Sequence, residues 1–592
     1  MESQSPKKVV VIGAGAGGIS TAARLAKAGL SVTVLEKNSF TGGRCSLLTH
    51  AGHRFDQGPS LLLLPKLFHQ AFHDLDTSLS AEGVELLKCP TNYSIYFNDA
   101  SPPFELTTDL ARMKSQIEHY EGKDGFVRYL SWLQESHAHY ELSVSEVLSR
   151  NFTSIWQLAM PKFVLTGLKL HPLHTIWQRA SLYFWSERLR RVFTFATMYM
   201  GMSPFDAPAT YSLLQYTELA EGIWYPRGGF HTILAALQRV GERYGVTYRL
   251  NTPVSQVLVD PNDGKTVKGV QLSSGETIPA DIVVVNADLV YAYNHLFPQL
   301  TPSVKKYSES LRDKPGSCSS ISFYWSLNRK VPELNTHNIF LADEYRDSFD
   351  AIFDRHTLPS EPSFYVNVPS RIDPTAAPPG CDSIIALVPV GHLPSSHGFP
   401  PTASASASKT QPHPQSQPQD WPALISQARQ AVLQTIEART NCAPLHPSIT
   451  HELINDPPTW QAKFNLDKGS ILGLSHSFFN VLAFRPATRA HGLRNAYFVG
   501  ASTHPGTGVP IVLAGSKITA EQVLDDLRLP VPWPRRRPRD ARAPDGPLQS
   551  GKLDQIRPPL VETSKSVLIT ALFAFLALIL SSLLVDVRFF GR

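Results

Sequence analysis

The residues with the clearest chemical potential are three glycines and an acid near the N-terminus. Gly13, Gly15 and Gly18 have the spacing G-x-G-x-x-G, directly after the apolar stretch "KVVVI". In such a motif the first glycine permits a tight turn, the second lets the backbone approach a pyrophosphate, and the third lets a helix pack closely on a strand. Glu36 lies near the expected spacing for a carboxylate that binds ribose hydroxyls and disfavours a 2′-phosphate. The pattern predicts a site for FAD or NAD rather than NADP.

A second glycine-rich motif follows in the sequence "TGGRC". Gly42 and Gly43 allow the chain to pass against a flat ring or a phosphate, and Arg44 can add a bidentate contact to an anion. In isolation, a turn with a surface arginine explains this motif equally well. Because FAD and NAD share the first fingerprint, the choice between them depends on motifs further along the chain.

The elements that must position these residues form a βαβ unit. Residues 8–36 contain an apolar strand, a glycine turn, an alanine-rich amphipathic helix ending at Gly29, and a second strand ending at Glu36. Residues 102–216 are mostly helical in pattern, and strands return in residues 245–289, which include the buried-looking "DIVVVNADL". The predicted fold class is α/β, with a Rossmann-like nucleotide-binding domain.

The composition is that of a globular protein with more than one domain. The chain has 592 residues, of which 42% are hydrophobic and 18% charged, and this excludes wholesale disorder. The net charge of +5 includes the run "RRRPRDAR", which fits anionic headgroups or a cytoplasmic flank better than nucleic acid. The five cysteines are scattered, and the 21 histidines show no clustered metal-ligand spacing. We therefore expect no nucleic-acid partner and no metal.

Three segments near the C-terminal half depart from this composition. Residues 395–420 have almost no large apolar side chains and predict a disordered insertion. Residues 529–565 form a Pro/Arg-rich linker, and residues 566–585 carry no charge. A helix over the latter would rise about 30 Å, the thickness of a bilayer's hydrocarbon. A buried helix is the alternative. We expect a single-pass transmembrane anchor. Because basic residues precede the span, we expect the body on the cytosolic face of the membrane. The endoplasmic reticulum is the expected membrane.

Several motifs together resemble one family. Glu36 followed by Gly-Gly-Arg resembles the second cofactor motif of the FAD-dependent amine oxidase and phytoene desaturase superfamily. Four further segments resemble the carotenoid desaturases of bacterial and fungal type: "HRFDQGPSLLL", "YPRGGFHTILAAL", "DIVVVNADL" and "YFVGASTHPGTGVPIVLAGSKITAEQVL". The matches run from residue 8 to residue 528, outside the insertion. The insertion and the anchor are departures from many bacterial relatives.

The resemblance implies an FAD-binding domain built from discontinuous segments. These are residues 8–95, 222–295 and 470–528, and a mixed helical and β substrate domain takes up residues 96–221 and 296–469. Together with the glycine motifs, the resemblance gives these cofactor-binding residues: Gly13, Gly15, Gly18, Glu36, Gly43, Arg44, Gly58, Pro59, Ser60, Gly500, Gly508 and Val509. NAD stays open as an alternative cofactor or as the electron acceptor.

The resemblance also implies an activity, that of a phytoene desaturase. It would introduce several successive double bonds into phytoene, giving lycopene or a further dehydrogenated product, with hydride transfer to the flavin. Phytoene and its partly desaturated intermediates reside in the lipid bilayer, where a tether raises the effective concentration. Association with other enzymes of the carotenoid pathway is a further expected partnership.

A hydrocarbon offers no hydrogen-bond handle, so its binding requires an apolar tunnel. Aromatic residues in the ranges 183–205 and 319–327 are candidates for its walls, although ordinary core packing explains most of them. No acid–base residue is assigned. Asp56 and His504 lie inside the family motifs, the latter more as a hydrogen-bonding group than as a base.

Two other interpretations remain. Another FAD oxidoreductase of the superfamily, such as an amine oxidase or a protoporphyrinogen oxidase, would share Gly13, Glu36 and Arg44 but should lack the "THPGTGVP" segment. A non-catalytic prenyl-lipid chaperone, like the Rab GDP dissociation inhibitors, would tolerate a degraded glycine fingerprint. This chain keeps the fingerprint intact.

Overall fold

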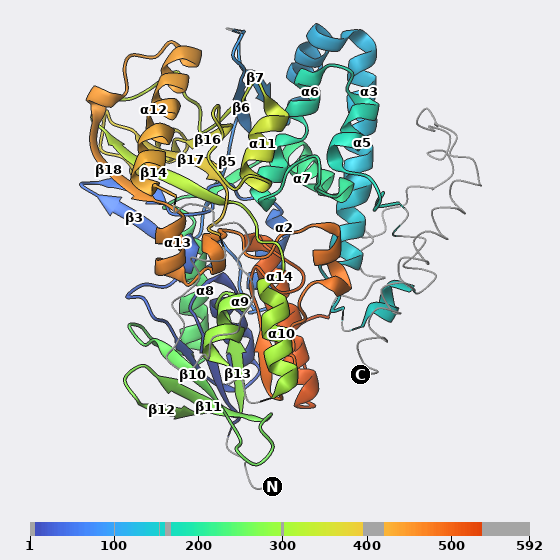
Figure 1. Ribbon diagram of the computed structural model, residues 1–592, viewed down its shortest axis with the longest axis vertical. Helices are drawn as coiled ribbons and strands as arrows, with labels where there is room; N and C mark the ends of the chain where they lie inside the picture. The colour runs from blue at the N-terminus through green and yellow to red at the C-terminus, as the bar shows by residue number, and fades with distance from the viewer. Residues whose placement is uncertain are drawn as a thin grey trace. The chain divides into compact units, whose positions relative to one another are not determined.

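Two sheets, built from strands that are far apart in the sequence, organise the chain (Figure 1). The computed structural model describes residues 6–99, 101–152, 154–159, 167, 169–297, 301–394 and 419–535. The predicted insertion, except for its last two residues, and the predicted anchor at residues 566–585 lie outside the described residues. Within the described part, no helix combines the length and the apolar character that crossing a bilayer requires.

The first sheet is parallel and has the strand order β19-β13-β1-β2-β9. Its strands are β1 (Lys8–Ile12), β2 (Ser31–Leu35), β9 (Thr247–Arg249), β13 (Ile282–Val285) and β19 (Ala496–Phe498). Val11 of β1 lies opposite Val34 and Val284 in this sheet. Strands buried on both faces read as continuous apolar runs, as β1 and β13 do. The sheet confirms the predicted α/β class and the assembly from separated segments.

Alternate residues of β1 face two different layers. Val9 and Val11 pack with the helices α1 (Ala16–Lys27), α8 (His231–Arg243) and α14 (Val509–Asp526). Val10 and Ile12 instead face a three-stranded antiparallel sheet and the helices after β13. This second layer contains β10 (Val254–Val259), β11 (Val267–Leu272), β12 (Thr277–Pro279), α9 (Leu289–Tyr291) and α10 (Pro302–Arg312). Figure 1 shows these elements in its lower half.

The second sheet has seven strands in the order β18-β14-β17-β16-β15-β6-β7. They are β6 (Tyr93–Tyr96), β7 (Phe104–Leu106), β14 (Ser319–Leu327), β15 (His337–Phe340), β16 (Phe364–Asn367), β17 (Ser383–Val390) and β18 (Ile449–Asn455). Phe323 and Trp325 share an apolar cluster with Val432 of α12 (Trp421–Thr440), while Tyr324 between them packs with Phe55 on the other face. Because side chains alternate along a strand, one set faces the covering helix and the other set faces the interior.

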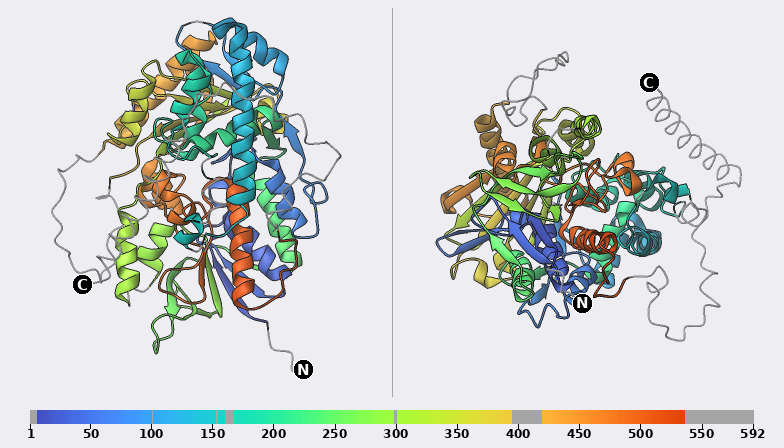
Figure 2. Two further views of the ribbon diagram at one scale, coloured as in Figure 1. Left: turned by 90° about the vertical axis from the view of Figure 1, so that its right-hand side faces the viewer. Right: turned by 90° about the horizontal axis from the view of Figure 1, so that it is seen from below.

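Helices cover the end of this sheet, as the pattern in residues 102–216 predicts. The longest is α3 (Leu110–Glu146), which Asp109 caps and which kinks at Gly122, where φ is +70°. In Figure 2, left, it runs down the upper half of the face turned to the viewer, drawn in blue to cyan, with α14 below it in orange-red. The shorter helices are α5 (Ile176–Tyr183), α6 (Glu187–Val192), η3 (Phe195–Met200), α7 (Leu213–Tyr216) and η5 (Thr217–Glu221). An aromatic cluster around Trp132 joins them.

The remaining elements connect the two sheets. They are β3 (Leu47–His50), β4 (His53–Asp56), α2 (Pro65–His73), β5 (Leu86–Lys88), β8 (Trp224–Pro226), α11 (Tyr345–Phe353) and α13 (Pro457–Phe464). Strand β6 already belongs to the seven-stranded sheet, although its first residues fall in the range 8–95 that the sequence assigns to the FAD-binding domain. The exact domain boundaries stay a prediction.

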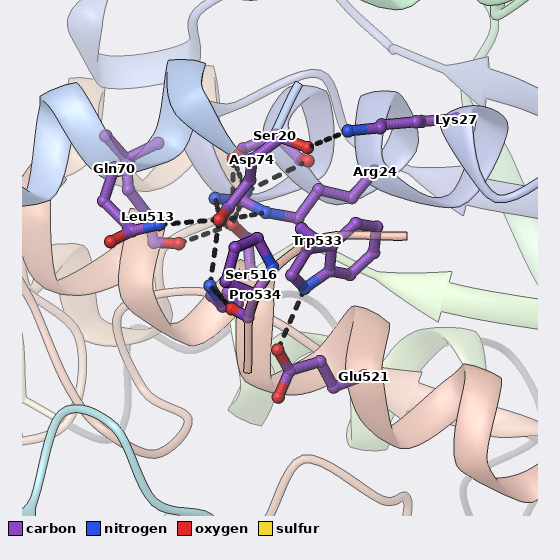
Figure 3. A network of polar contacts seen from close by, with 11 residues as sticks. Ser20, Arg24, Lys27, Gln70, Asp74, Leu513, Ser516, Glu521, Trp533 and Pro534 are labelled. Carbon is purple, nitrogen blue, oxygen red and sulfur yellow. Dashed lines mark hydrogen bonds and ion pairs between the residues drawn. The ribbon is translucent and has the colours of Figure 1, made fainter. Parts of the chain in front are cut away.

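A buried ion pair joins three helices of the parallel-sheet layer (Figure 3). The Arg24 side chain on α1 donates to Asp74, which follows α2, at 2.9 Å, and both side chains are almost fully inaccessible to solvent. Lys517 on α14 donates to the other oxygen of Asp74, also at 2.9 Å, and Gln70 donates to it at 2.8 Å. Burial raises the pKa of Asp74, but Arg24 and Lys517 outweigh burial and hold the pKa below its usual value.

The substitution Asp74→Asn should destabilise the fold by about 3–5 kcal/mol, because it leaves two cations without their carboxylate in a buried site. Urea unfolding of the purified protein measures this change. The control is Asp525→Asn, which removes the exposed ion pair with Arg535 and should cost less than about 1 kcal/mol. Equal effects of the two substitutions would contradict the assigned role of Asp74.

Candidate functional site

One cavity of about 780 Å³ lies between the two sheets. It collects residues from both ends of the chain, and every predicted cofactor-binding residue except Gly18 lines it: Gly13, Gly15, Glu36, Gly43, Arg44, Gly58, Pro59, Ser60, Gly500, Gly508 and Val509. The fold therefore brings these separated motifs together. Their individual contacts show what each one does.

Steric contacts explain why the turn after β1 needs glycine at three positions. Gly13 has a φ of +96°, and a Cβ on Gly18 would lie only 2.0 Å from the Gly13 carbonyl oxygen. Gly18 thus acts in the contact between helix and turn, as predicted, and does not reach the cavity. A Cβ on Gly15 would lie 2.7 Å from the side-chain nitrogen of Asn286. The close neighbour that requires this glycine is therefore a side chain of the protein itself.

Glu36 ends the second strand beside this turn. Its Oε2 accepts a hydrogen bond from the Ala14 backbone at 2.8 Å, and its Oε1 accepts from the backbone and side chain of Asn38 at 2.9 and 3.0 Å. These bonds orient the carboxylate at the cavity wall, where it is 6% exposed. An oriented carboxylate offers its remaining lone pairs to hydroxyl groups, as ribose recognition requires.

Two residues after β13 also line the cavity. They lie in the segment "DIVVVNADL", but the sequence analysis assigned neither of them to the site. Asn286 lies against the glycine turn, where its side chain donates to the Gly13 carbonyl at 3.4 Å. Asp288 caps α9 by accepting from the Tyr291 backbone at 3.0 Å. Burial raises the pKa of Asp288 to about 7, with Asp467 adding to the shift. Their position was the available signal, because ligands bind at the carboxyl ends of parallel strands.

The Gly-Gly-Arg motif forms a short turn against the cavity. Gly42 and Gly43 have φ values of +96° and +55°, which favour glycine. The Arg44 guanidinium donates to the Ile471 carbonyl. Burial lowers the pKa of Arg44, while Asp288 opposes that shift. Arg44 is therefore a partly buried cation at the cavity wall and not a surface arginine.

Two helices begin at the cavity without a capping side chain. The N-cap residues of α1 and α14 are Gly15 and Gly508, and neither offers a side chain to the first amides of its helix. Helix N-termini carry free N–H groups and the positive end of the helix dipole. The first suits a pyrophosphate and the second suits a group that gains negative charge on reduction.

The far part of the cavity is apolar and rich in aromatic side chains. Its wall includes residues from η3, α7, α11, β15 and β16: Phe195, Met198, Tyr199, Met200, Leu214, Ile339, Tyr345, Phe349, Phe364 and Tyr365. Four of these fall in the predicted range 183–205. Of the range 319–327, only Ser320 lines the cavity, because Phe323 and Trp325 face α12. Ordinary core packing thus explains the aromatic residues of β14.

Asp56 and His504, which lie inside the family motifs, do not line the cavity. Asp56 accepts hydrogen bonds from the Tyr225 hydroxyl and the Phe230 backbone, both at 2.7 Å. The His504 ring nitrogen Nε2 donates to the Arg150 carbonyl at 2.7 Å, and burial lowers the pKa of His504 to about 4. Both residues hold loops in place, which agrees with a hydrogen-bonding role for His504.

One group of possible metal ligands occurs in the described residues. Atoms of Glu135, His139 and His171 lie within 4.8 Å of one another. The sequence spacing did not reveal this group, because His171 lies outside α3. Arg179 donates to both oxygens of Glu135, with Nε at 3.0 Å from Oε1, and the Tyr183 hydroxyl donates at 2.7 Å. The guanidinium already takes the place of a cation there, so we assign no metal to this group.

Comparisons with known proteins agree with this geometry. The family described as flavin containing amine oxidoreductase matches residues 16–368. A phytoene desaturase of Neurospora crassa is 62% identical over 540 residues, which cover 90% of this chain and 87% of that protein. A phytoene desaturase of Fusarium fujikuroi is 60% identical over 539 residues, covering 90% and 92%. The chain belongs to the phytoene desaturases.

Phytoene desaturases of this family are FAD-dependent oxidoreductases, and the described residues fit that cofactor. The glycine turn, the oriented Glu36 carboxylate, Arg44 and two uncapped helix N-termini line one cavity. The fold is shared with cyclohexylamine oxidase of Brevibacterium oxydans at a TM-score of 0.54 and 16% identity, covering 88% of this chain and all of that one (100%). Neither alternative interpretation of the sequence is favoured by these relatives.

The substitution Gly18→Ala should abolish FAD binding in this phytoene desaturase, because the added Cβ clashes with the Gly13 carbonyl and displaces the start of α1. The flavin absorbance of the purified protein, per mole of chain, measures the loss. Gly241→Ala is the matched control, since Gly241 also lies in a helix and has no positive φ, and the atoms nearest its Cβ position are 3.4 Å away, in ordinary contact. Full flavin content in the Gly18 variant would contradict the assignment of the turn.

Proposed function

We propose that this chain removes hydrogen from phytoene and introduces several successive double bonds, giving lycopene or a further dehydrogenated carotene. The observation that carries the proposal is the continuity of one cavity. Its nucleotide end contains Glu36 and the glycine turn, and its other end contains apolar and aromatic side chains. A linear hydrocarbon can be aligned only by shape and apolar contact, and this end offers both.

The segment of residues 58–64 is central to this arrangement. Gly58, Pro59 and Ser60 line the cavity together with the apolar side chains of Leu61, Leu63 and Leu64. The Ser60 hydroxyl also forms a 2.7 Å hydrogen bond with Tyr365 of the seven-stranded sheet. The segment thereby joins the wall of the nucleotide end to the wall of the apolar end.

The residues of the chain bind, orient and exclude water. Glu36 and the N-terminus of α1 would hold the nucleotide part of FAD, and the N-terminus of α14 would lie against its ring system. When bound, FAD supplies the two-electron acceptor that dehydrogenation of a saturated carbon pair needs. Apolar walls keep water from the reacting carbons and hold the chain of the substrate straight. NAD as the electron acceptor and association with other pathway enzymes stay predictions.

Attachment to a membrane is the second part of the proposal. The uncharged residues 566–585 and the preceding basic residues support a single-pass anchor with a cytosolic body, and a substrate that dissolves in lipid supports the same arrangement. Such an anchor keeps the cavity near its substrate, since tethering raises the effective concentration at the bilayer.

Expression of the chain in cells that accumulate phytoene tests the activity. We expect phytoene to be replaced by carotenes with more conjugated double bonds, which absorb at longer wavelengths and separate by chromatography. The Gly18→Ala variant is the control without cofactor and should leave phytoene unchanged. Unchanged phytoene with the unaltered chain, at full flavin content, would refute the proposed substrate.

A truncation tests the anchor. The cut belongs after Arg535, because Trp533, beyond the end of α14, is buried against the body and donates to Glu521 at 2.9 Å. The protein of residues 1–535 should keep its flavin and move from the membrane pellet to the supernatant. If it still sediments with lipid vesicles to the same extent, the C-terminal segment is not the main attachment.

A further inference from the structure

A carboxyl group lies buried beside the aromatic part of the cavity. Glu218 lies in the short π-helix η5, is fully inaccessible to solvent, and has no ion-pair partner among the described residues. Its Oε1 accepts a hydrogen bond from the Tyr93 hydroxyl at 3.1 Å, and its Oε2 accepts from the Gln215 side chain at 3.1 Å. Burial raises the pKa of Glu218 to about 8.

Tyr93 connects this carboxyl to the cavity wall. The rings of Tyr93 and Tyr199 stack with 6.1 Å between their centroids, and Tyr199 lines the cavity. The buried Tyr199 hydroxyl interacts with the Tyr93 hydroxyl, although the two form no hydrogen bond of ordinary geometry, and it has no other partner in the described part of the chain. Burial, and next the nearby Glu218, raise the pKa of Tyr199 well above its usual value. A buried hydroxyl without an ordinary hydrogen bond costs folding free energy, so its presence here calls for a functional explanation.

The other groups around Tyr93 do not compete for a proton. His337 on β15 lies 6.1 Å from the Tyr93 ring, and burial lowers its pKa to about 3, so it is neutral. Tyr365 on β16 shares its hydroxyl with Ser60 and with His337 Nδ1, at 2.7 Å each. Burial raises the pKa of Tyr365 well above its usual value. Glu218 is therefore the group of this cluster that can exchange a proton near neutral pH.

We propose that Glu218 accepts the proton that leaves the substrate, through the hydroxyl groups of Tyr199 and Tyr93. This inference rests on the proposed function. In each desaturation one hydrogen leaves with its bonding electrons to the oxidised flavin, and the adjacent carbon loses a proton. The electrons of the second C–H bond become the new bond between the two carbons. The Tyr199 oxygen takes this proton while its own passes to Tyr93, and the Tyr93 proton passes to the Glu218 carboxylate.

A purely structural role does not require a carboxyl group at this position. A glutamine could accept from Tyr93 through its oxygen and, with the Gln215 amide turned over, donate to the Gln215 oxygen, without introducing a charge into the core. An ionisable group buried without a cation is costly to keep, and such groups collect where proton transfer takes place. A general base is most effective when its pKa lies near the pH at which the enzyme works.

The variant Glu218→Gln separates the two roles, because its amide can bond to Tyr93 and, after the Gln215 amide turns over, to Gln215, but it cannot take up a proton. With phytoene in liposomes we expect its kcat to fall at least ~100-fold while KM and flavin content stay unchanged. The rate of the unaltered enzyme should rise with pH up to about 8, and the residual rate of the variant should not. Tyr199→Phe should lose rate in the same way. Glu221→Gln, in the same π-helix but paired with Lys66, is the matched control with full activity.

Thermal unfolding provides a readout that needs no substrate. The pKa of Glu218 is raised in the folded state from 4.5 to about 8, so its protonated form stabilises the fold. The unaltered protein should lose melting temperature relative to Glu218→Gln as pH rises from 5 to 8, and the difference should be constant above that. If the melting temperatures of the two proteins change with pH by the same amount across this range, the inference is overturned.

The activity readout separates this inference from the proposed function. Full kcat with the wild-type pH profile in both Glu218→Gln and Tyr199→Phe would overturn the inference alone. If the unaltered enzyme oxidises no phytoene, the proposed function fails and the inference fails with it. Should Glu218→Gln not fold, Tyr199→Phe carries the kinetic test, since it removes a single hydroxyl that makes no hydrogen bond of ordinary geometry.

Discussion

The site depends on one constraint: helix α1 must begin in close contact with the turn that follows strand β1. The chain can turn there because Gly18 has no side chain to meet the Gly13 carbonyl oxygen. This turn directs the first amides of α1 to the cavity and fixes Ala14 where Glu36 can accept its N–H. The same helix carries Arg24, whose buried ion pair with Asp74 ties α1 to α2 and α14. Cofactor geometry and the stability of this layer thus depend on one close approach.

The second sheet contributes through its alternation. One set of side chains on β14 and β17 packs under α12, and the other set faces inward, so a single layer of strands both builds a core and walls the cavity. Few polar groups interrupt the aromatic wall. The Ser60 and Tyr365 hydroxyls are hydrogen-bonded to each other, and His337 behind the wall bonds to Tyr365 as well. An interior of this kind selects for shape and for the absence of water.

Local motifs made the nucleotide end predictable from the sequence. The β1–α1–β2 unit, the glycine turn and Glu36 are adjacent in the chain, and their spacing alone defines their geometry. The rest depends on contacts between distant segments. Asn286 and Glu218 acquire their roles only when β13 meets the glycine turn and η5 meets β6. For β14 the sequence misled in the other direction. Its aromatic composition suits a tunnel, but its register directs Phe323 and Trp325 to a helix.

The segment of residues 58–64 belongs to the walls of both the nucleotide end and the apolar end, which limits how this part of the enzyme can evolve. A substitution there alters the fit of the nucleotide and of the hydrocarbon together, so most changes are harmful in one respect or the other. Residues at the opposite end, such as Tyr345 and Phe349 on α11, line only the apolar part. Variation in chain length or in the extent of oxidation can therefore accumulate on α11 without disturbing the flavin, and directed evolution of product range should begin there.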